Sequence, residues 1–141
     1  VSVSDLAHLL DKNMAGQLTY LDYQSAEEVS IPVSLTITRK GEHKLDFAFE
    51  YPGESSTNNV NTITIAEDGS SFNGEDVFAR QEVGGDIIIS TRSSGKDDGK
   101  KVEFVTTYTF SPDGYSSKKL VKFKNGTKLV RNRFDLKITS D

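Results

Sequence analysis

The sequence predicts an all-β protein, an antiparallel up-and-down meander closed into a barrel of about eight to ten strands, with a short N-terminal helix. Apolar and polar side chains alternate over many short segments, turn signals separate these segments, and only the first residues have helical spacing. A meander with one apolar face has two bare edges, which closure into a barrel removes. We expect a single domain over 1–141, with the helix at 1–15 and the barrel at 16–141.

The helix prediction depends on the first sixteen residues. Ser4 is suited to cap a helix, and Asp5 is suited to the positive end of a helix dipole. Gly16 is expected to end the helix. Such a short helix is not stable alone, so its apolar stripe should dock on the barrel. The apolar positions with helical spacing are Leu6, Leu9, Leu10 and Met14.

The clearest strands lie in the first half of the chain. Apolar residues occupy every second position over 29–37 and again over 45–51, and Lys40-Gly41-Glu42 separates the two runs. This pattern predicts a hairpin with one buried face. Shorter strands are expected around 18–23, 63–65 and 72, and then over 77–83 and 86–91, with an exposed loop at 93–100.

The second half of the chain predicts two further hairpins. Apolar residues alternate over 102–110, and Pro112-Asp113-Gly114 then forms a turn, because Pro fixes φ and Gly accepts a positive φ. Asn125-Gly126 is the strongest hairpin signal in the chain, and it separates segments 115–123 and 129–138. The connections are local, which favours a meander over a Greek key.

Composition restricts the classes of function. The chain has 141 residues, no Cys and a net charge of −4. The absence of Cys excludes disulfides and zinc–thiolate sites within these residues. An acidic chain is untypical of nucleic-acid binding, so no nucleic-acid partner is expected. No apolar run approaches the roughly 20 residues of a transmembrane helix.

Chemistry-bearing motifs are few. The chain has no nucleophile-elbow, P-loop or dinucleotide-binding motif, so we predict no catalytic residue and no cofactor. His8 and His43 are far apart and lack nearby ligands, so no metal ligand is assigned to them. A turn-rich stretch that resembles loops with calcium ligands is interpreted as ordinary acidic turns, because its spacing does not fit an EF-hand. Its residues are Asp68, Asn73, Glu75 and Asp76.

The candidate binding residues are the aromatic side chains of the predicted apolar face. One interpretation makes them the lining of a ligand pocket, since such pockets are mostly apolar with a few polar groups. The other makes them a packed core, since small barrels can be filled by their own side chains. Tyr51 and Tyr108 favour the pocket, because a buried hydroxyl needs a partner. The candidates are Phe47, Phe49, Tyr51, Phe104, Tyr108, Phe110 and Phe134.

The charge is uneven along the chain. Positions 1–113 have 9 basic and 19 acidic residues, whereas positions 114–141 have 8 basic and 2 acidic residues. The basic segment either binds an anionic partner or forms a solvated face that pairs across strands with acidic residues. Its residues are Lys118, Lys119, Lys122, Lys124, Lys128, Arg131, Arg133 and Lys137.

A short helix, a Gly-led first strand and a long meander together resemble the calycin group, which includes lipocalins, fatty-acid-binding proteins and small lipocalin-like domains of bacterial exported proteins. Gly16-Gln17-Leu18 corresponds to the lipocalin Gly-x-Trp motif, with Leu in place of Trp. Arg131 or Arg133 corresponds to the last-strand Arg that covers that Trp.

The resemblance implies an exported, extracytoplasmic barrel that loses an N-terminal segment and binds a small apolar or amphipathic molecule at its mouth. The alternative is a structural or interaction module with a packed core that acts through its surface. The ligand and the oligomeric state stay open.

Overall fold

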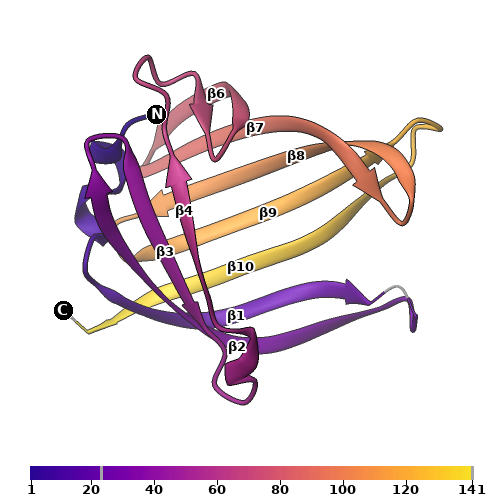
Figure 1. The fold of residues 1–141 in the computed structure, drawn as a ribbon, viewed down its shortest axis with the longest axis horizontal. Coiled ribbons are helices and arrows are strands. Elements are labelled where there is room, and N and C mark those ends of the chain that lie inside the picture. The colour runs from indigo at the N-terminus through magenta and orange to yellow at the C-terminus, as the bar shows by residue number, and fades with distance from the viewer. Residues whose placement is uncertain (23, 141) are drawn as a thin grey trace.

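A computed structural model describes residues 1–22 and 24–140 of the chain. In this described part, ten strands form one antiparallel sheet, accompanied by two 3-10 helices (Figure 1). Neither helix is long and apolar enough to cross a lipid bilayer. The helices are η1 (Val3–Leu9) and η2 (Ser55–Thr57). The strands are β1 (Asn13–Asp22), β2 (Glu27–Gly41), β3 (Lys44–Glu50), β4 (Asn59–Thr64), β5 (Ser71–Phe72), β6 (Glu75–Val83), β7 (Asp86–Asp97), β8 (Lys100–Ser111), β9 (Gly114–Phe123) and β10 (Lys128–Ser140).

The strand order is that of a meander whose ends meet. The order in the sheet is β4-β3-β2-β1-β10-β9-β8-β7-β6-β5, so neighbouring strands are consecutive in sequence and the first strand pairs with the last. An antiparallel bridge between Ile65 and Phe72 joins the two outer strands, and Asn73 N donates to Thr64 O over 3.0 Å. The protein is therefore a nearly closed up-and-down barrel, as the sequence predicts.

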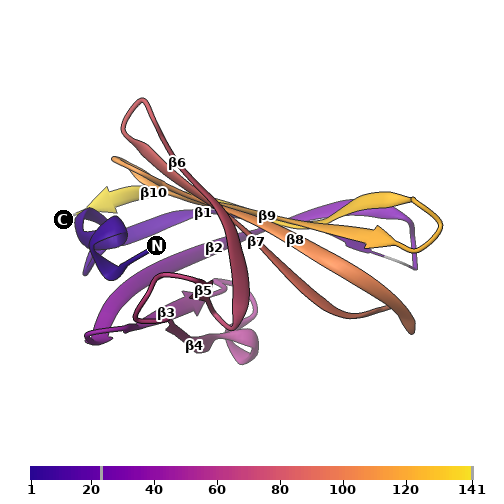
Figure 2. The ribbon, with the colours of Figure 1, turned by 90° about the horizontal axis from the view of Figure 1, so that it is seen from above.

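The strands differ in length, and this difference shapes the barrel. β3 and β4 have 7 and 6 residues, whereas β8 and β10 have 12 and 13. The hairpins β1–β2, β7–β8 and β9–β10 extend well past the layer formed by β3, β4 and β5 (Figure 2). One end of the barrel is consequently covered on all sides, while the other end opens into long, curved hairpins.

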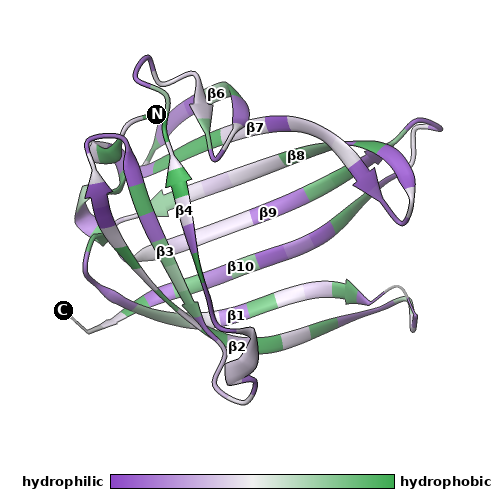
Figure 3. Cartoon of the chain, viewed as in Figure 1, coloured by the Kyte–Doolittle hydropathy of each residue, from purple (hydrophilic) through white to green (hydrophobic). Residues whose placement is uncertain are grey.

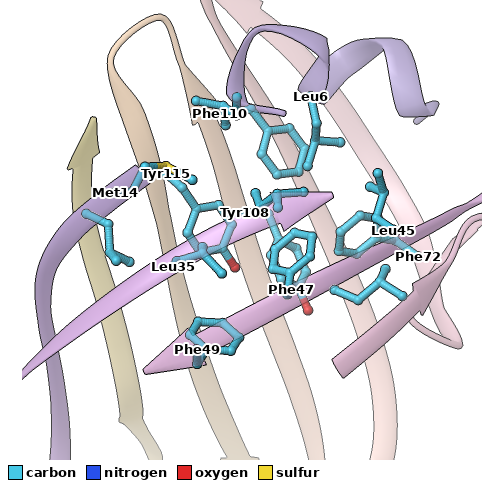
Figure 4. Close-up of a cluster of buried hydrophobic side chains, with 14 of the residues drawn as sticks. Leu6, Met14, Leu35, Leu45, Phe47, Phe49, Phe72, Tyr108, Phe110 and Tyr115 are labelled. Carbon is cyan, nitrogen blue, oxygen red and sulfur yellow. The ribbon is translucent and has the colours of Figure 1, made fainter. Parts of the chain in front are cut away.

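The covered end contains a close-packed core. Hydrophobic and hydrophilic bands follow one another along strands such as β3 and β10, as alternation predicts (Figure 3). The inward side chains meet in a cluster that includes Leu6, Met14, Leu45, Phe72 and Phe110, all fully buried (Figure 4). Aromatic rings meet here in tilted, edge-to-face and stacked pairs, with ring centroids 4.7 Å apart for Phe72 and Tyr108. These are the preferred geometries of aromatic pairs.

The N-terminal helix is shorter than predicted and of a different type. A short N-terminal helix is present as predicted, but its predicted extent over 1–15 was wrong, because the 3-10 helix η1 ends at Leu9 and Met14 already lies in β1. Val3, Leu6 and Leu9 are buried, and their spacing of three matches the three residues per turn of a 3-10 helix. Leu10 is extended and Asp11 has a φ of 62°, so the chain turns there into the barrel.

An ion pair anchors η1 to the barrel. Arg80 of β6 donates to both carboxylate oxygens of Asp5, over 2.8 and 3.1 Å. Asp5 also accepts a hydrogen bond from Ser2 N, which forms a capping box at the start of the helix. The cap residue is therefore Ser2 and not Ser4. Burial raises the pKa of Asp5, but the hydrogen bonds from Arg80 and Ser2 outweigh it and leave that pKa below its usual value.

The exposed loop predicted at 93–100 was also wrong. β7 continues to Asp97 and β8 begins at Lys100, so this segment forms the end of a long hairpin. Asp98 and Gly99 both have positive φ, as the two central residues of a tight hairpin turn require. The Asp-Gly pair signalled this turn, but the polar composition around it concealed the strand pairing.

Close contact between β1 and β10 closes the meander. Gly16 lies opposite Leu136, and a Cβ at Gly16 would be 1.8 Å from the carbonyl oxygen of Asp135. Gly114 of β9 has a similar constraint, since its Cβ would be 2.2 Å from Leu136 O. Glycine within a strand often marks such a close backbone approach. Gly16 therefore allows β1 to pack closely against β10, and it lies in a strand instead of ending a helix.

Candidate functional site

A cavity of about 300 Å³ lies inside the barrel. Aromatic side chains form part of its wall, and amides, hydroxyls, one carboxylate and one ammonium group form the rest. Seven strands, β3, β4 and β6 to β10, contribute to this wall, together with two residues that lie just outside the strands. The lining residues are Phe47, Phe49, Tyr51, Asn59, Asn61, Ile63, Asn73, Glu75, Ser93, Thr106, Tyr108, Tyr115, Ser117, Lys119, Asn132 and Phe134.

Most of the predicted binding residues surround this cavity. It is lined by Phe47, Phe49, Tyr51, Tyr108 and Phe134, which come from three separate segments of the chain. The ring centroids of Phe49 and Phe134 are 5.0 Å apart, so β3 and β10 meet across the barrel interior. Several of these residues belong to the core and to the cavity wall at once. The packed core and the cavity wall thus share part of the aromatic face.

The other two candidates lie away from the cavity. Phe110 is fully buried in the covered end, where its ring lies 6.1 Å from Phe72 and 6.2 Å from Tyr115. Phe104 lies further along β8, among the extended hairpins, with the Lys119 ammonium 4.2 Å from its ring centroid. Ligand binding by any of the seven residues stays a prediction.

Glu75 is the polar centre of the cavity. Its Oε1 accepts hydrogen bonds from the Thr91 hydroxyl over 2.6 Å and from the Tyr108 hydroxyl over 3.1 Å. Its Oε2 lies 3.3 Å from the Tyr108 hydroxyl and accepts from the Asn73 amide over 3.5 Å. β6, β7, β8 and the turn before β6 thus bring four side chains to one point inside the barrel.

Sequence reasoning missed this role, because Glu75 stood in an acidic, turn-rich stretch. The signal that places it inside is its two-residue spacing from Val77, which packs against the core. Asp68, which belongs to the same acidic stretch of the sequence, instead accepts a hydrogen bond from Ser70 N within its own turn, over 3.0 Å. Among the described residues, no group of three or more acidic or histidine side chains is arranged to hold a metal ion.

The tyrosines of the cavity are neutral hydrogen-bonding groups. Burial, together with the nearby Tyr115 and the negative charge of Glu75, raises the pKa of Tyr108 far above its usual value. Burial likewise raises the pKa of Tyr115, and a hydrogen bond with Ser117 only partly offsets it. The pKa of Tyr51 is raised by burial and lowered to a smaller extent by Asn59. The hydroxyls of Tyr51 and Tyr108 therefore have polar partners, as expected for buried phenols.

The basic C-terminal segment has two faces. On the outer face Lys122 pairs with Glu103 over 4.0 Å, and Arg133 pairs with Glu28 over 3.6 Å. This agrees with the interpretation as a solvated face that pairs across strands. Lys119 does not fit this interpretation, because its side chain lines the cavity. Alternation along β9 sends Lys119 and its neighbour Lys118 to opposite faces.

Arg131 also departs from the outer face. It forms an ion pair with Asp97 of β7, with Nε 3.7 Å from Oδ1, and it donates to the carbonyl of Leu21 in β1. A register shift between Val130 and Asn132 marks a bulge in β10 at this residue. Of the two arginines that the calycin resemblance indicated, Arg131 is thus the one that links strands across the open end.

The barrel architecture is compatible with a calycin-like fold, and the comparisons with known proteins name no family. No protein-family model matches the chain, and the search of curated proteins found no match. The functional interpretation therefore depends on the geometry of the cavity.

Proposed function

We propose that this protein is a binding module that holds a small amphipathic molecule in the barrel cavity. The observation that carries this proposal is the cavity itself, about 300 Å³ in volume and lined by aromatic and polar side chains together. Ligand sites in proteins range from roughly 300 to 1,000 Å³ and combine apolar walls with a few polar groups. The volume of this cavity suits a ligand at the small end of that range.

The mixed lining favours an amphipathic ligand over a purely apolar one. Phe49 and Phe134 offer an apolar surface, whereas Asn61 and Asn132 present amides to the same space. A purely apolar ligand would remove these amides from water without replacing their hydrogen bonds, which is unfavourable. A ligand with an apolar body and a few polar groups satisfies both parts of the wall.

Native mass spectrometry of the purified protein tests the proposal by searching for a co-purified molecule.

A matched pair of variants on β4 then locates the site. Asn61 lines the cavity, whereas its neighbour Val60 is 62% exposed on the outside. We expect Asn61→Phe to fill the cavity and weaken binding at least ~10-fold, a cost of about 1.4 kcal/mol. Val60→Phe should leave binding unchanged. Equal binding by both variants would place the ligand elsewhere.

An extracytoplasmic location is part of the same proposal. Its support is the resemblance to small barrel domains of exported proteins. Fractionation of cells that express the complete gene tests it, and recovery of the protein only in the cytoplasm would contradict it.

A second candidate function is capture of an anionic partner at the ends of the long hairpins. A surface hollow of about 550 Å³ lies there, with Phe123 among three lysines, Lys100, Lys101 and Lys124. Of the basic segment predicted from the sequence, only Lys124 belongs to this hollow. Heparin serves as a polyanionic probe. We expect Lys124→Glu to weaken retention on heparin more than Lys44→Glu on β3, and equal retention would count against this function.

A further inference from the structure

Asp5, Asp97 and Glu75 are buried or half-buried carboxylates that differ in whether a cation pairs with them. Asp5 is bound by Arg80 through two hydrogen bonds, and Asp97 pairs with Arg131. Glu75 accepts hydrogen bonds only from neutral groups, and within the described ranges it forms no ion pair. Glu75 is half-buried, and a cation beside a carboxylate that is partly shielded from water is attracted more strongly than one in bulk solvent. Glu75 is therefore a carboxylate that faces a cavity without a protein counter-ion.

The surroundings of Glu75 suit a cation in a second way. The rings of Phe47, Phe49, Tyr51 and Tyr108 line the same cavity. The faces of aromatic rings carry negative charge density and attract ammonium groups, most strongly where water is excluded. A carboxylate together with aromatic walls is a combination that stabilises an alkylammonium group.

Lys119 limits which cationic ligands fit the cavity. It lines the cavity from β9, and its register partner Thr106 is two residues from Tyr108 along β8, toward the open end. Two residues of a strand span about 6.6 Å. The wall therefore carries a negative group near the covered end and a positive group nearer the opening. This arrangement disfavours a second cation at the outer end of the ligand.

We propose that the ligand is a monoamine with an apolar body, whose ammonium group pairs with Glu75 among the aromatic rings. This inference rests on the proposed function and specifies the chemical class of its ligand. The apolar body lies against Phe49 and Phe134, and the end of the ligand near Lys119 is neutral or anionic.

Two probes of nearly identical shape test the charge preference. 2-Phenylethylamine and 2-phenylethanol differ in one group, ammonium against hydroxyl, and each is titrated into the ¹⁵N-labelled protein at pH 7 and followed by amide chemical shifts. In the wild type we expect the amine to bind at least ~10-fold more tightly than the alcohol, the ratio that corresponds to about 1.4 kcal/mol. This comparison requires no variant, so it does not depend on any substituted protein folding.

A matched pair of variants then assigns the preference to one carboxylate. Glu75→Gln keeps the size of the side chain and a carbonyl acceptor but removes the charge. We expect it to bring the two affinities to within ~3-fold. Asp76→Asn removes one charge from the adjacent, exposed position, and the amine preference should persist there.

The possible results separate this inference from the proposed function. Equal affinity for amine and alcohol, with shifts confined to cavity residues, would show a binding cavity that lacks the charge preference and would overturn the inference alone. If neither probe binds, the inference and the proposed function are both refuted for ligands of this size. A preference that survives Glu75→Gln would also overturn the assignment to Glu75.

Discussion

At the covered end of the barrel Leu6, Phe72 and Phe110 are fully buried, whereas at the open end Tyr51 and Phe134 are only half-buried around a cavity. Both ends have the same alternation of inward and outward side chains. They differ in cover, because η1 and the short strands β3 to β5 lie over one end only. At about 3.3 Å per residue, a strand of 12 residues runs roughly 17 Å past one of 7. Strand length thus separates the packed region from the candidate binding region.

The largest expected effect contrasts a packed with a half-buried aromatic residue. Phe72→Ala should lower the free energy of unfolding by about 3–5 kcal/mol, because it leaves a cavity in a region that is already close-packed. Phe134→Ala should cost about 1–2 kcal/mol, since its ring already borders open space. Urea denaturation measures both. Equal losses would mean that the two ends are packed alike.

The seam between β1 and β10 gives the next effect. Gly16→Ala should cost about 3 kcal/mol, because the new methyl group overlaps the Asp135 carbonyl and the backbones must separate. Gly41→Ala is the control, since no atom lies within 4 Å of its Cβ position and its φ is not positive. The control should change stability by less than ~0.5 kcal/mol. A neutral Gly16→Ala would contradict the close approach of these strands.

Removal of one hydroxyl tests the polar centre of the cavity. Tyr108→Phe should cost about 1–2 kcal/mol at pH 7, because Glu75 loses a donor and has no cation to replace it. Tyr20→Phe, at a half-buried position of β1, should have a smaller effect. Chemical denaturation of each variant gives the comparison.

The same tyrosine predicts a dependence on alkaline pH. Because burial raises the pKa of Tyr108 in the folded state, the unfolded chain loses its proton first. The contribution of Tyr108 to stability should therefore be constant below the unfolded pKa of about 10 and fall as the pH rises above it. The fall should be shallower in Tyr108→Phe. An identical slope in both proteins would contradict the burial of this phenol.

The smallest effect concerns the attachment of η1 to the covered end. Asp5→Asn should cost about 1 kcal/mol at pH 7, because it weakens the hydrogen bonds from Arg80 without changing the size of the side chain. The pKa of Asp5 is lowered, so its contribution is present above pH ~4 and is lost as the pH falls through the folded pKa. Thermal melts of both proteins between pH 7 and pH 2.5 should converge at the acidic end. A constant difference would exclude the ion pair as the cause.

The strands that sequence reasoning placed well are those with local signals. The alternation over 29–37 and 45–51 predicts β2 and β3, and Asn125-Gly126 predicts the β9–β10 turn. These signals act between residues that are close in sequence, so they can be read without the fold. The placement of Phe47, Phe49 and Tyr108 on the inward face follows from the same alternation.

For other positions, bulges and the register between strands that are distant in sequence decided which side chains face inward. Alternation over 130–138 places Val130 inside, but the bulge at Arg131 pairs Val130 with Leu120 and sets Leu129 opposite the buried Val121. One extra residue reverses which side chains face inward, and no local pattern marked its position.

By itself, the sequence determined an antiparallel meander with one apolar face, since alternation and turn chemistry are properties of neighbouring residues. Only the tertiary structure decided that Glu75 meets Tyr108, 33 positions away, and that Lys119 lines the same cavity. Side chains converge at a cavity through the registers of several strands and through unequal strand lengths. Those quantities depend on the closed barrel as a whole, because each pairing is fixed only when the sheet closes.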